Sequence, residues 1–348
     1  LCSVLMVACI YPIRIPMLRY FGASDTTLPY ANAYFTIYLT GTVFALMSTG
    51  MNQFIICQGF AKTGMYSVII GAVLNIVLDP VFIFGFHMGV SGAATATVLS
   101  QTASCAFVLK TLFGKTVPVR ITFGGYDWRL IRRILTIGFT PFIIIAMDNV
   151  MIITMNAILQ KYGGAARGDL LITCATIAQS FMLVVTMPLG GITSGTQAVL
   201  AYNFGAGNTD RVKGAQKYIF ILAAAYTTLL FILARTVGGL FVRLFTSDPT
   251  VAAEALRAIR IFTLAIIPLA FQYEIVDGFT GLGQVQVALP LSFFRKGLYF
   301  VSLFLLPAMF GAEAAFFAEP VSDIAGPVVS AIVYIVSMKG ILAKAGKN

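Results

Sequence analysis

Asn75 and Asp79 are the residues of this sequence whose types and spacing most directly suggest chemistry. They are four residues apart, so on a helix their side chains share one face. An amide oxygen beside a carboxylate offers hard oxygen ligands, which suit a sodium ion or a proton. Pro80 follows directly, and it has no N–H to donate to the carbonyl oxygen of Ile76. The stretch therefore predicts a site for a small cation, although the two side chains could instead hydrogen-bond neighbouring helices.

Several further carboxyl groups lie in apolar segments. A carboxyl group at the centre of a bilayer costs about 2.5–3.5 kcal/mol, so it usually faces a cavity or a partner, or is neutralised. For Glu319 and Asp323, which are also four apart, we expect a structural role, with one group protonated or paired with Arg295 or Lys296. The six such acids, of thirteen in the chain, are Asp79, Asp148, Glu274, Asp277, Glu319 and Asp323.

The elements that must position these groups are long apolar helices. Apolar residues make up 59% of the chain and charged residues 10%, which excludes a disordered chain or a coiled coil and argues against a water-soluble enzyme. The net charge of +10 could suggest nucleic acid. However, the basic residues lie in short loops between apolar runs, as expected for anchors at a membrane surface. The composition predicts an all-α polytopic membrane protein.

A bilayer-spanning helix needs about 20 mostly apolar residues. On this basis we expect ten spans, which break at turn residues near 22–25, 163–164, 205–208 and 247–249. The predicted spans are residues 1–18, 28–57, 65–86, 89–112, 131–160, 169–203, 216–242, 252–280, 286–310 and 312–338.

A weak internal repeat suggests two similar halves. Gly59 and Gly281 are 222 residues apart, and so are Gly89 and Gly311. Parallel six-helix halves are a known transporter plan. In that register, two helices, roughly 90 residues, would precede Leu1, which gives ten helices of an expected twelve. We therefore expect the chain to be truncated at its N-terminus.

Polar linkers and basic loops predict the domains and the orientation. The longest polar linker suggests an N-terminal lobe at 1–113, a cytoplasmic linker at 114–130 and a C-terminal lobe with a short basic tail at 131–348. Lys and Arg are concentrated in one set of alternate connections, which predicts a cytoplasmic C-terminus. That set comprises residues 58–64, 110–133, 204–217 and the tail.

Two motifs resemble those of multidrug and toxic compound extrusion (MATE) transporters, a likeness that extends over essentially the whole chain. The more specific one is NIVLDPVFIFG at 75–85 followed by GVSGAATAT at 89–97. Softer matches are PLGGITSG at 188–195 with NFGAGNTDR at 203–211, and the segments 281–283 and 318–323.

The resemblance implies a fold, an activity and a site. Such transporters have two six-helix lobes and exchange sodium or protons for cationic, often aromatic, drugs. By motif match, the coupling site would comprise Asn75, Asp79 and Thr97, with the carbonyl of Ala93 as a further ligand. The acid that the family places on its first helix has no counterpart in this sequence. Beyond a possible sodium ion at Asn75 and Asp79, we expect no metal and no cofactor.

Other candidates have weaker support. The resemblance suggests substrate or proton roles for Asp148, Glu274 and Asp277, although structural pairing is the alternative. Gln179 and Met182 could line an adaptable drug cavity, but residues of these types at helical spacing more often serve packing. These five positions are therefore secondary candidates.

The leading hypothesis is a secondary-active multidrug efflux antiporter, a monomer in the inner (plasma) membrane of a prokaryotic cell. We expect organic cations and the lipid bilayer as partners, and no nucleic acid. No phosphate-binding loop is present, so we expect an ion gradient or the substrate's own gradient to supply the energy. The alternatives are a lipid-linked oligosaccharide flippase, an inactive truncated product, and an intramembrane enzyme. The enzyme is disfavoured because His87 is the only histidine.

Overall fold

The chain is almost entirely helical and divides into two compact units, Leu1–Tyr126 and Asp127–Asn348. A computed structural model describes residues 2–20, 28–114, 117–122, 124–125, 127–343 and 345. The two units are described in turn below. The predicted break at 22–25 lies outside the described residues.

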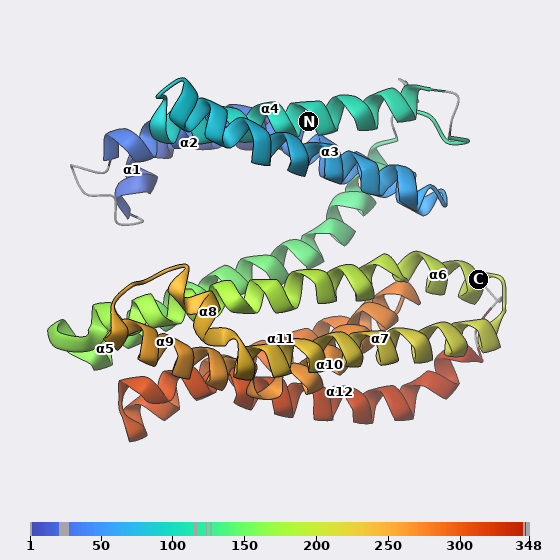
Figure 1. Ribbon diagram of the computed structural model, residues 1–348. Helices are drawn as coiled ribbons and strands as arrows, with labels where there is room; N and C mark the ends of the chain where they lie inside the picture. The colour runs from blue at the N-terminus through green and yellow to red at the C-terminus, as the bar shows by residue number, and fades with distance from the viewer. Residues whose placement is uncertain are drawn as a thin grey trace. The chain divides into compact units, whose positions relative to one another are not determined.

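The first unit is a layer of long helices joined by short connections (Figure 1). Its third helix runs directly into a short π-helical segment, which begins after Pro80. Its elements are α1 (Cys2–Tyr20), α2 (Leu28–Cys57), α3 (Ala61–Pro80), η1 (Val81–Gly85) and α4 (Gly89–Phe113).

Small residues allow the helices of the first unit to approach closely. A Cβ atom on Gly41 of α2 would lie 2.3 Å from a side-chain carbon of Val98 on α4, so only glycine fits there. Ser104 of α4 is linked to both neighbouring helices. Its hydroxyl lies 2.8 Å from that of Ser48 on α2 and donates to the carbonyl oxygen of Ser67 on α3 at 2.7 Å. Close approach through small residues is how membrane helices pack without a hydrophobic driving force.

Gly92 fixes the distance between η1 and α4. A Cβ atom on this glycine would lie 2.8 Å from the carbonyl oxygen of Phe82. Because the neighbour is a backbone atom, it cannot rotate away as a side chain could. The glycine therefore brings the first turn of α4 against the end of the α3–η1 segment. This contact sets the position of Thr97, which lies further along α4.

The second unit is a larger helical bundle (Figure 1), with buried apolar clusters between its helices. Its long first helix is followed by a short one. Two short 3-10 segments each join one helix to the next. Its elements are α5 (Trp128–Gly195), α6 (Gln197–Gly205), α7 (Thr209–Thr236), α8 (Gly238–Arg243), α9 (Pro249–Phe262), η2 (Thr263–Ala265), α10 (Ile266–Gly281), α11 (Val285–Phe310), η3 (Ala312–Phe317) and α12 (Ala318–Leu342).

Two of the predicted breaks have clear local causes. In α5 the backbone leaves helical geometry at Gly164, where φ is +62°, a value that glycine adopts without steric cost. At the start of α9, Asp248 caps the helix by accepting from the backbone N–H of Thr250 at 2.7 Å. Pro249 occupies the first helical position, where its missing N–H costs nothing.

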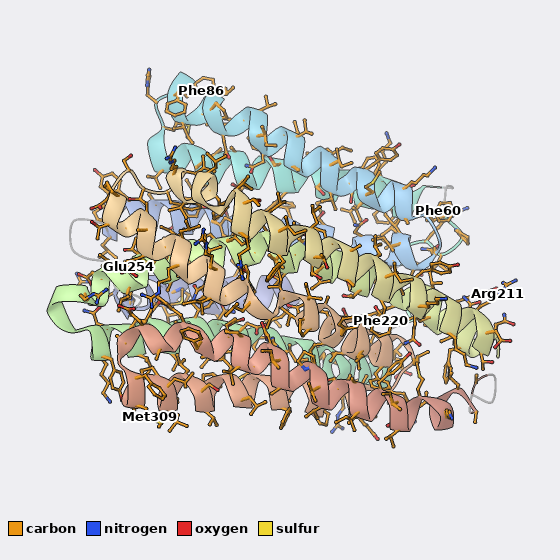
Figure 2. All side chains as sticks on the ribbon, turned by 60° about the horizontal axis from the view of Figure 1, so that its bottom comes forward. Phe60, Phe86, Arg211, Phe220, Glu254 and Met309 are labelled. Carbon is orange, nitrogen blue, oxygen red and sulfur yellow. The ribbon has the colours of Figure 1, made fainter. Side chains whose placement is uncertain are left out.

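Eight helices in the described part of the chain are long and apolar enough to cross a membrane. The chain is therefore a multi-pass membrane protein. The predicted spans 1–18 and 28–57 do form helices, α1 and α2, but neither is among the eight, so the count of ten is not confirmed. In the second unit, Glu254 and Arg211 lie near opposite ends of the bundle (Figure 2).

Candidate functional site

The cluster predicted in the first unit is present as a set of direct contacts. The side-chain nitrogen Nδ2 of Asn75 donates to Oδ1 of Asp79 at 3.2 Å. The same nitrogen lies 3.4 Å from the hydroxyl of Thr97, which it reaches across the interface between α3 and α4. The Thr97 hydroxyl in turn donates to the carbonyl oxygen of Ala93 at 2.9 Å. The structure therefore brings together all four residues of the predicted coupling site.

The local sequence explains this geometry. Asn75 and Asp79 are one helical turn apart on α3, and Thr97 and Ala93 are one turn apart on α4. The close approach at Gly92 holds the two helices together. The four residues are half-buried, whereas Ile76, next to Asn75, is 72% exposed. The side chain of Asn75 thus turns towards α4, while the apolar side chain of Ile76 is exposed at the surface, where lipid would lie.

The second unit contains a cavity of about 740 Å³. Two of the secondary candidates, Asp148 on α5 and Asp277 on α10, lie in its wall. The other polar side chains of the wall are those of Gln197, Gln272, Tyr273, Thr280, Ser292, Arg295 and Lys296.

Asp277 is held by two donors from the segment that follows the α5 kink. The hydroxyl of Thr193 donates to its Oδ2 at 2.5 Å, and Nε2 of Gln197 donates to its Oδ1 at 3.0 Å. Both oxygens of the carboxyl group therefore accept a hydrogen bond, and the two contacts fix its orientation at the cavity wall.

Two adjacent basic residues on α11 pair with different acids. Nη1 of Arg295 lies 2.8 Å from Oδ1 of Asp323 on α12, which is fully buried. Nζ of Lys296 forms a short ion pair with Asp148 and also donates to the carbonyl oxygen of Ile144 at 2.7 Å. The sequence indicated pairing of Asp323 with one of the two basic residues, but it gave no indication of the Lys296–Asp148 pair. The only available signal was the presence of two basic residues inside an apolar span.

Three other candidates lie away from the cavity wall in the described part of the chain. Glu274 is 1% exposed, and neither of its carboxyl oxygens has a hydrogen-bond partner among the described residues. Met182, 7% exposed, belongs to the main apolar cluster of the second unit, together with Phe181. Gln179 is half-buried on the same helix. The position of Met182 fits packing, while roles for all three remain predictions.

The residues present could accept a small cation at one place. Asn75, Asp79, Thr97 and Ala93 together carry an amide, a carboxylate, a hydroxyl and a carbonyl oxygen, all of them hard ligands. Among the residues that the structure describes, no group of three His, Cys, Asp or Glu side chains comes together as a metal site.

Comparison with known proteins gives relatives along most of the chain. The multidrug export protein MepA of Staphylococcus haemolyticus is 25% identical over 293 residues, which are 83% of this chain and 63% of the relative. MepA of Staphylococcus aureus strain MSSA476 is 25% identical over 294 residues, with the same shares. The chain thus spans about 63% of the length of these curated relatives.

Solved structures share the fold. A MOP superfamily transporter from Pyrococcus furiosus, whose structure is described as having a binding pocket of reverse polarity, superimposes with a TM-score of 0.89 at 21% identity, covering 98% of this chain and 76% of that one. A MATE structure in the bent conformation gives a TM-score of 0.85 at 20% identity, covering 97% and 75%. The family model described as MatE matches residues 1–81 and 145–305. With the Asn75–Asp79–Thr97 cluster that the motif predicted, the chain belongs to the MatE family.

Proposed function

We propose that the chain acts in secondary-active multidrug efflux, exporting cationic or aromatic drugs in exchange for Na⁺ or H⁺. In this proposal it lies in a prokaryotic plasma membrane, with its C-terminus in the cytoplasm, and works as a monomer. The curated relatives are named multidrug export proteins, which favours export over the flipping of lipid-linked oligosaccharides. The observation that carries the proposal is the contact of Asn75 with both Asp79 and Thr97.

The hydrogen bonds of this cluster suit an ionised Asp79. Asn75 presents its N–H groups, which stabilise a negative carboxylate. A sodium ion needs oxygen ligands, so its arrival would require the Asn75 amide to turn and present Oδ1 instead. A proton would likewise turn one of the two oxygens of the Asp79 carboxyl group into a donor, which suits an Asn75 amide that presents Oδ1. In this proposal, either event changes the contact between Asn75 and Thr97.

This change supplies the coupling in the proposed cycle. Because the amide of Asn75 joins α3 to α4, its rearrangement alters the packing of the two helices. Binding of the ion thus favours one conformation of the transporter over another, which is the thermodynamic requirement for exchange. Drug release on one side and ion release on the other follow from alternation between the two conformations.

Transport by the reconstituted chain tests the proposal. Export of a fluorescent cationic dye from proteoliposomes is measured under a sodium gradient and then under a pH gradient. We expect one gradient to drive export and Asp79→Asn to abolish it, because the substitution removes the charge but keeps the shape. Asp210→Asn is the matched control, since the Asp210 side chain is 98% exposed in the second unit. Wild-type export by Asp79→Asn would contradict the coupling role.

A further inference from the structure

Lys296 and Asp148 form an ion pair, but the two residues differ greatly in how exposed they are. Lys296 is 2% exposed, whereas the side chain of Asp148 is 49% exposed. Both line the cavity of the second unit. A molecule that enters the cavity therefore meets the carboxylate of Asp148, while the ammonium group lies beneath it. The carboxylate is thus accessible to a second positive charge.

The other titratable groups around Lys296 lie on α10, α11 and α12. Arg295, beside it on α11, is bound to Asp323 of α12. Glu319 is a further acid on α12 near both basic residues. From α10, Tyr273 and Asp277 reach the cavity wall.

The acid of η3 belongs to a different network. Glu313 is bound by Arg167 and Arg257 instead of by Lys296. Among the described residues of the elements packed against α11, Asp148 is therefore the acid that contacts the Lys296 ammonium directly.

We propose that an organic cation and the proton on Lys296 are mutually exclusive occupants of this cavity. The inference rests on the proposed export of cationic drugs and adds the residue that exchanges the proton at the substrate cavity. The cation takes the carboxylate of Asp148, so the buried ammonium of Lys296 loses its counter-ion. A buried charge without a partner is strongly unfavourable.

Lys296 then releases one proton from Nζ to the water of the cavity. One positive charge enters and one leaves, so the net charge of the site does not change. In the structure, the carbonyl oxygen of Ile144 accepts from Nζ at 2.7 Å. The neutral amine still has N–H groups that can donate to this oxygen. When the cation leaves, a proton returns to Lys296 and the ion pair forms again.

This exchange makes cation affinity depend on pH. Since binding of each cation releases one proton, affinity rises with pH by about tenfold per unit where the release is complete. Proton uptake on the acidic side of the membrane would correspondingly displace the cation. The cavity thus provides a second point of exchange, separate from the cluster around Asp79.

Proton release on ligand binding tests the inference. The purified full chain in lipid nanodiscs is titrated with tetraphenylphosphonium in weak buffer, and a pH indicator records the protons released. We expect about one proton per cation bound. Lys296→Gln should abolish the release and bind the cation at least as tightly, with no dependence on pH. Asp148→Asn should weaken binding by tenfold or more.

Lys296→Arg provides the sharpest comparison. Arginine keeps its charge in a protein, so the side chain of this variant cannot become neutral by releasing a proton. We expect it to bind the cation at least tenfold more weakly than the wild type, without proton release. Lys213→Gln is the matched control because Lys213 is an exposed lysine that also forms an ion pair, with Asp210.

Several results would overturn the inference. These are cation binding by the wild type without proton release, no cation binding at all, release that persists in Lys296→Gln, or wild-type affinity in Lys296→Arg. Wild-type affinity in Lys296→Arg would mean that the basic side chain pairs with Glu319 when the cation binds, instead of losing its charge. Release that is lost in Asp79→Asn but kept in Lys296→Gln would support coupling at Asp79 alone. Conversely, wild-type transport by Asp79→Asn would contradict the proposed coupling and leave these binding results intact.

Discussion

Arg295 of α11 and Asp323 of α12 form an ion pair of 2.8 Å that is buried within the second unit. Asp323 is fully enclosed, and the side chain of Arg295 is 12% exposed. A second oxygen of the carboxylate, Oδ2, has no hydrogen-bond partner among the described residues. The pair therefore depends on a single strong contact, and removal of either member leaves a buried charge behind.

Arg295→Met should destabilise the protein strongly. Breaking a buried ion pair by removing one partner typically costs about 3–5 kcal/mol, because the remaining charge has no compensation. Thermal unfolding in detergent measures the effect. The double variant Arg295→Met with Asp323→Leu should recover most of the lost stability, since it removes both charges. If the single and double variants are equally unstable, the cost arises from lost packing and not from the unpaired carboxylate.

Ion pairs at the exposed end of the second unit should contribute far less to stability. Arg167 and Arg257 both contact Glu313, at 2.9 and 3.0 Å, but their side chains are more than half exposed. Exposed ion pairs typically contribute about 0–1 kcal/mol. We expect Glu313→Gln to lower stability by less than about 1 kcal/mol in the same unfolding assay. A loss as large as that of Arg295→Met would show that this network is shielded from water in the membrane-bound protein.

The contacts of Asn75 with Asp79 and Thr97 could be predicted because the three residues are close in the sequence. Asn75 and Asp79 are one turn apart, so helical periodicity alone places them on one face. Thr97 lies on the next helix, and consecutive helices with a short connection usually pack together. Helical periodicity therefore indicates the pair of Asn75 and Asp79, and the resemblance to the MATE family adds Thr97 and Ala93.

The pairing inside the second unit could not be predicted in the same way. Asp148 and Lys296 are 148 residues apart in the sequence, and no local pattern relates them. The sequence indicated only that basic and acidic groups in apolar spans need partners. Which acid pairs with which base depends on how α5, α10, α11 and α12 pack. The spacing of Glu319 and Asp323 predicted one of these acids as the partner of Arg295 or Lys296. In the structure, Arg295 pairs with Asp323, and Lys296 pairs with Asp148.

Gly92→Ala should impair both stability and transport. The added Cβ would lie 2.8 Å from the carbonyl oxygen of Phe82, so α4 must move away from η1. Overpacking of this kind typically costs about 1–3 kcal/mol. The same movement would lengthen the contact between Asn75 and Thr97. Thermal unfolding and dye export are the measurements.

Gly50→Ala is the matched control for Gly92→Ala. Gly50 lies inside α2, and a Cβ atom there would meet nothing within 4 Å. Alanine in place of glycine inside a helix usually stabilises by roughly 0.5–1 kcal/mol. We therefore expect this control to unfold at the same or a higher temperature than the wild type. Equal behaviour of the two variants would mean that contact with Phe82 does not limit the approach of α4.

Thr97→Val should weaken ion coupling more than Thr97→Ser. Valine matches the shape of threonine but removes the hydroxyl that accepts from Asn75 and donates to Ala93. A hydrogen bond contributes about 0.5–1.5 kcal/mol, which corresponds to a two- to tenfold change in apparent ion affinity. Serine retains the hydroxyl and should remain near the wild type. The concentration of ion that gives half-maximal dye export is the readout, and similar values for valine and serine would exclude a role for the hydroxyl.

Glu274→Gln should leave stability within about 1 kcal/mol of the wild type. Glu274 is 1% exposed, and the described residues offer its carboxyl group no hydrogen-bond partner. An unpaired buried charge would cost far more than folding can supply, so the group is accommodated in its neutral form. Glutamine has the same shape and is also neutral. By contrast, Gln272→Glu should be clearly destabilising, because its amide now donates to Leu291 and accepts from Ser330. If thermal unfolding shows Glu274→Gln to be as unstable as Gln272→Glu, then Glu274 is charged and a cation must occupy the space beside it.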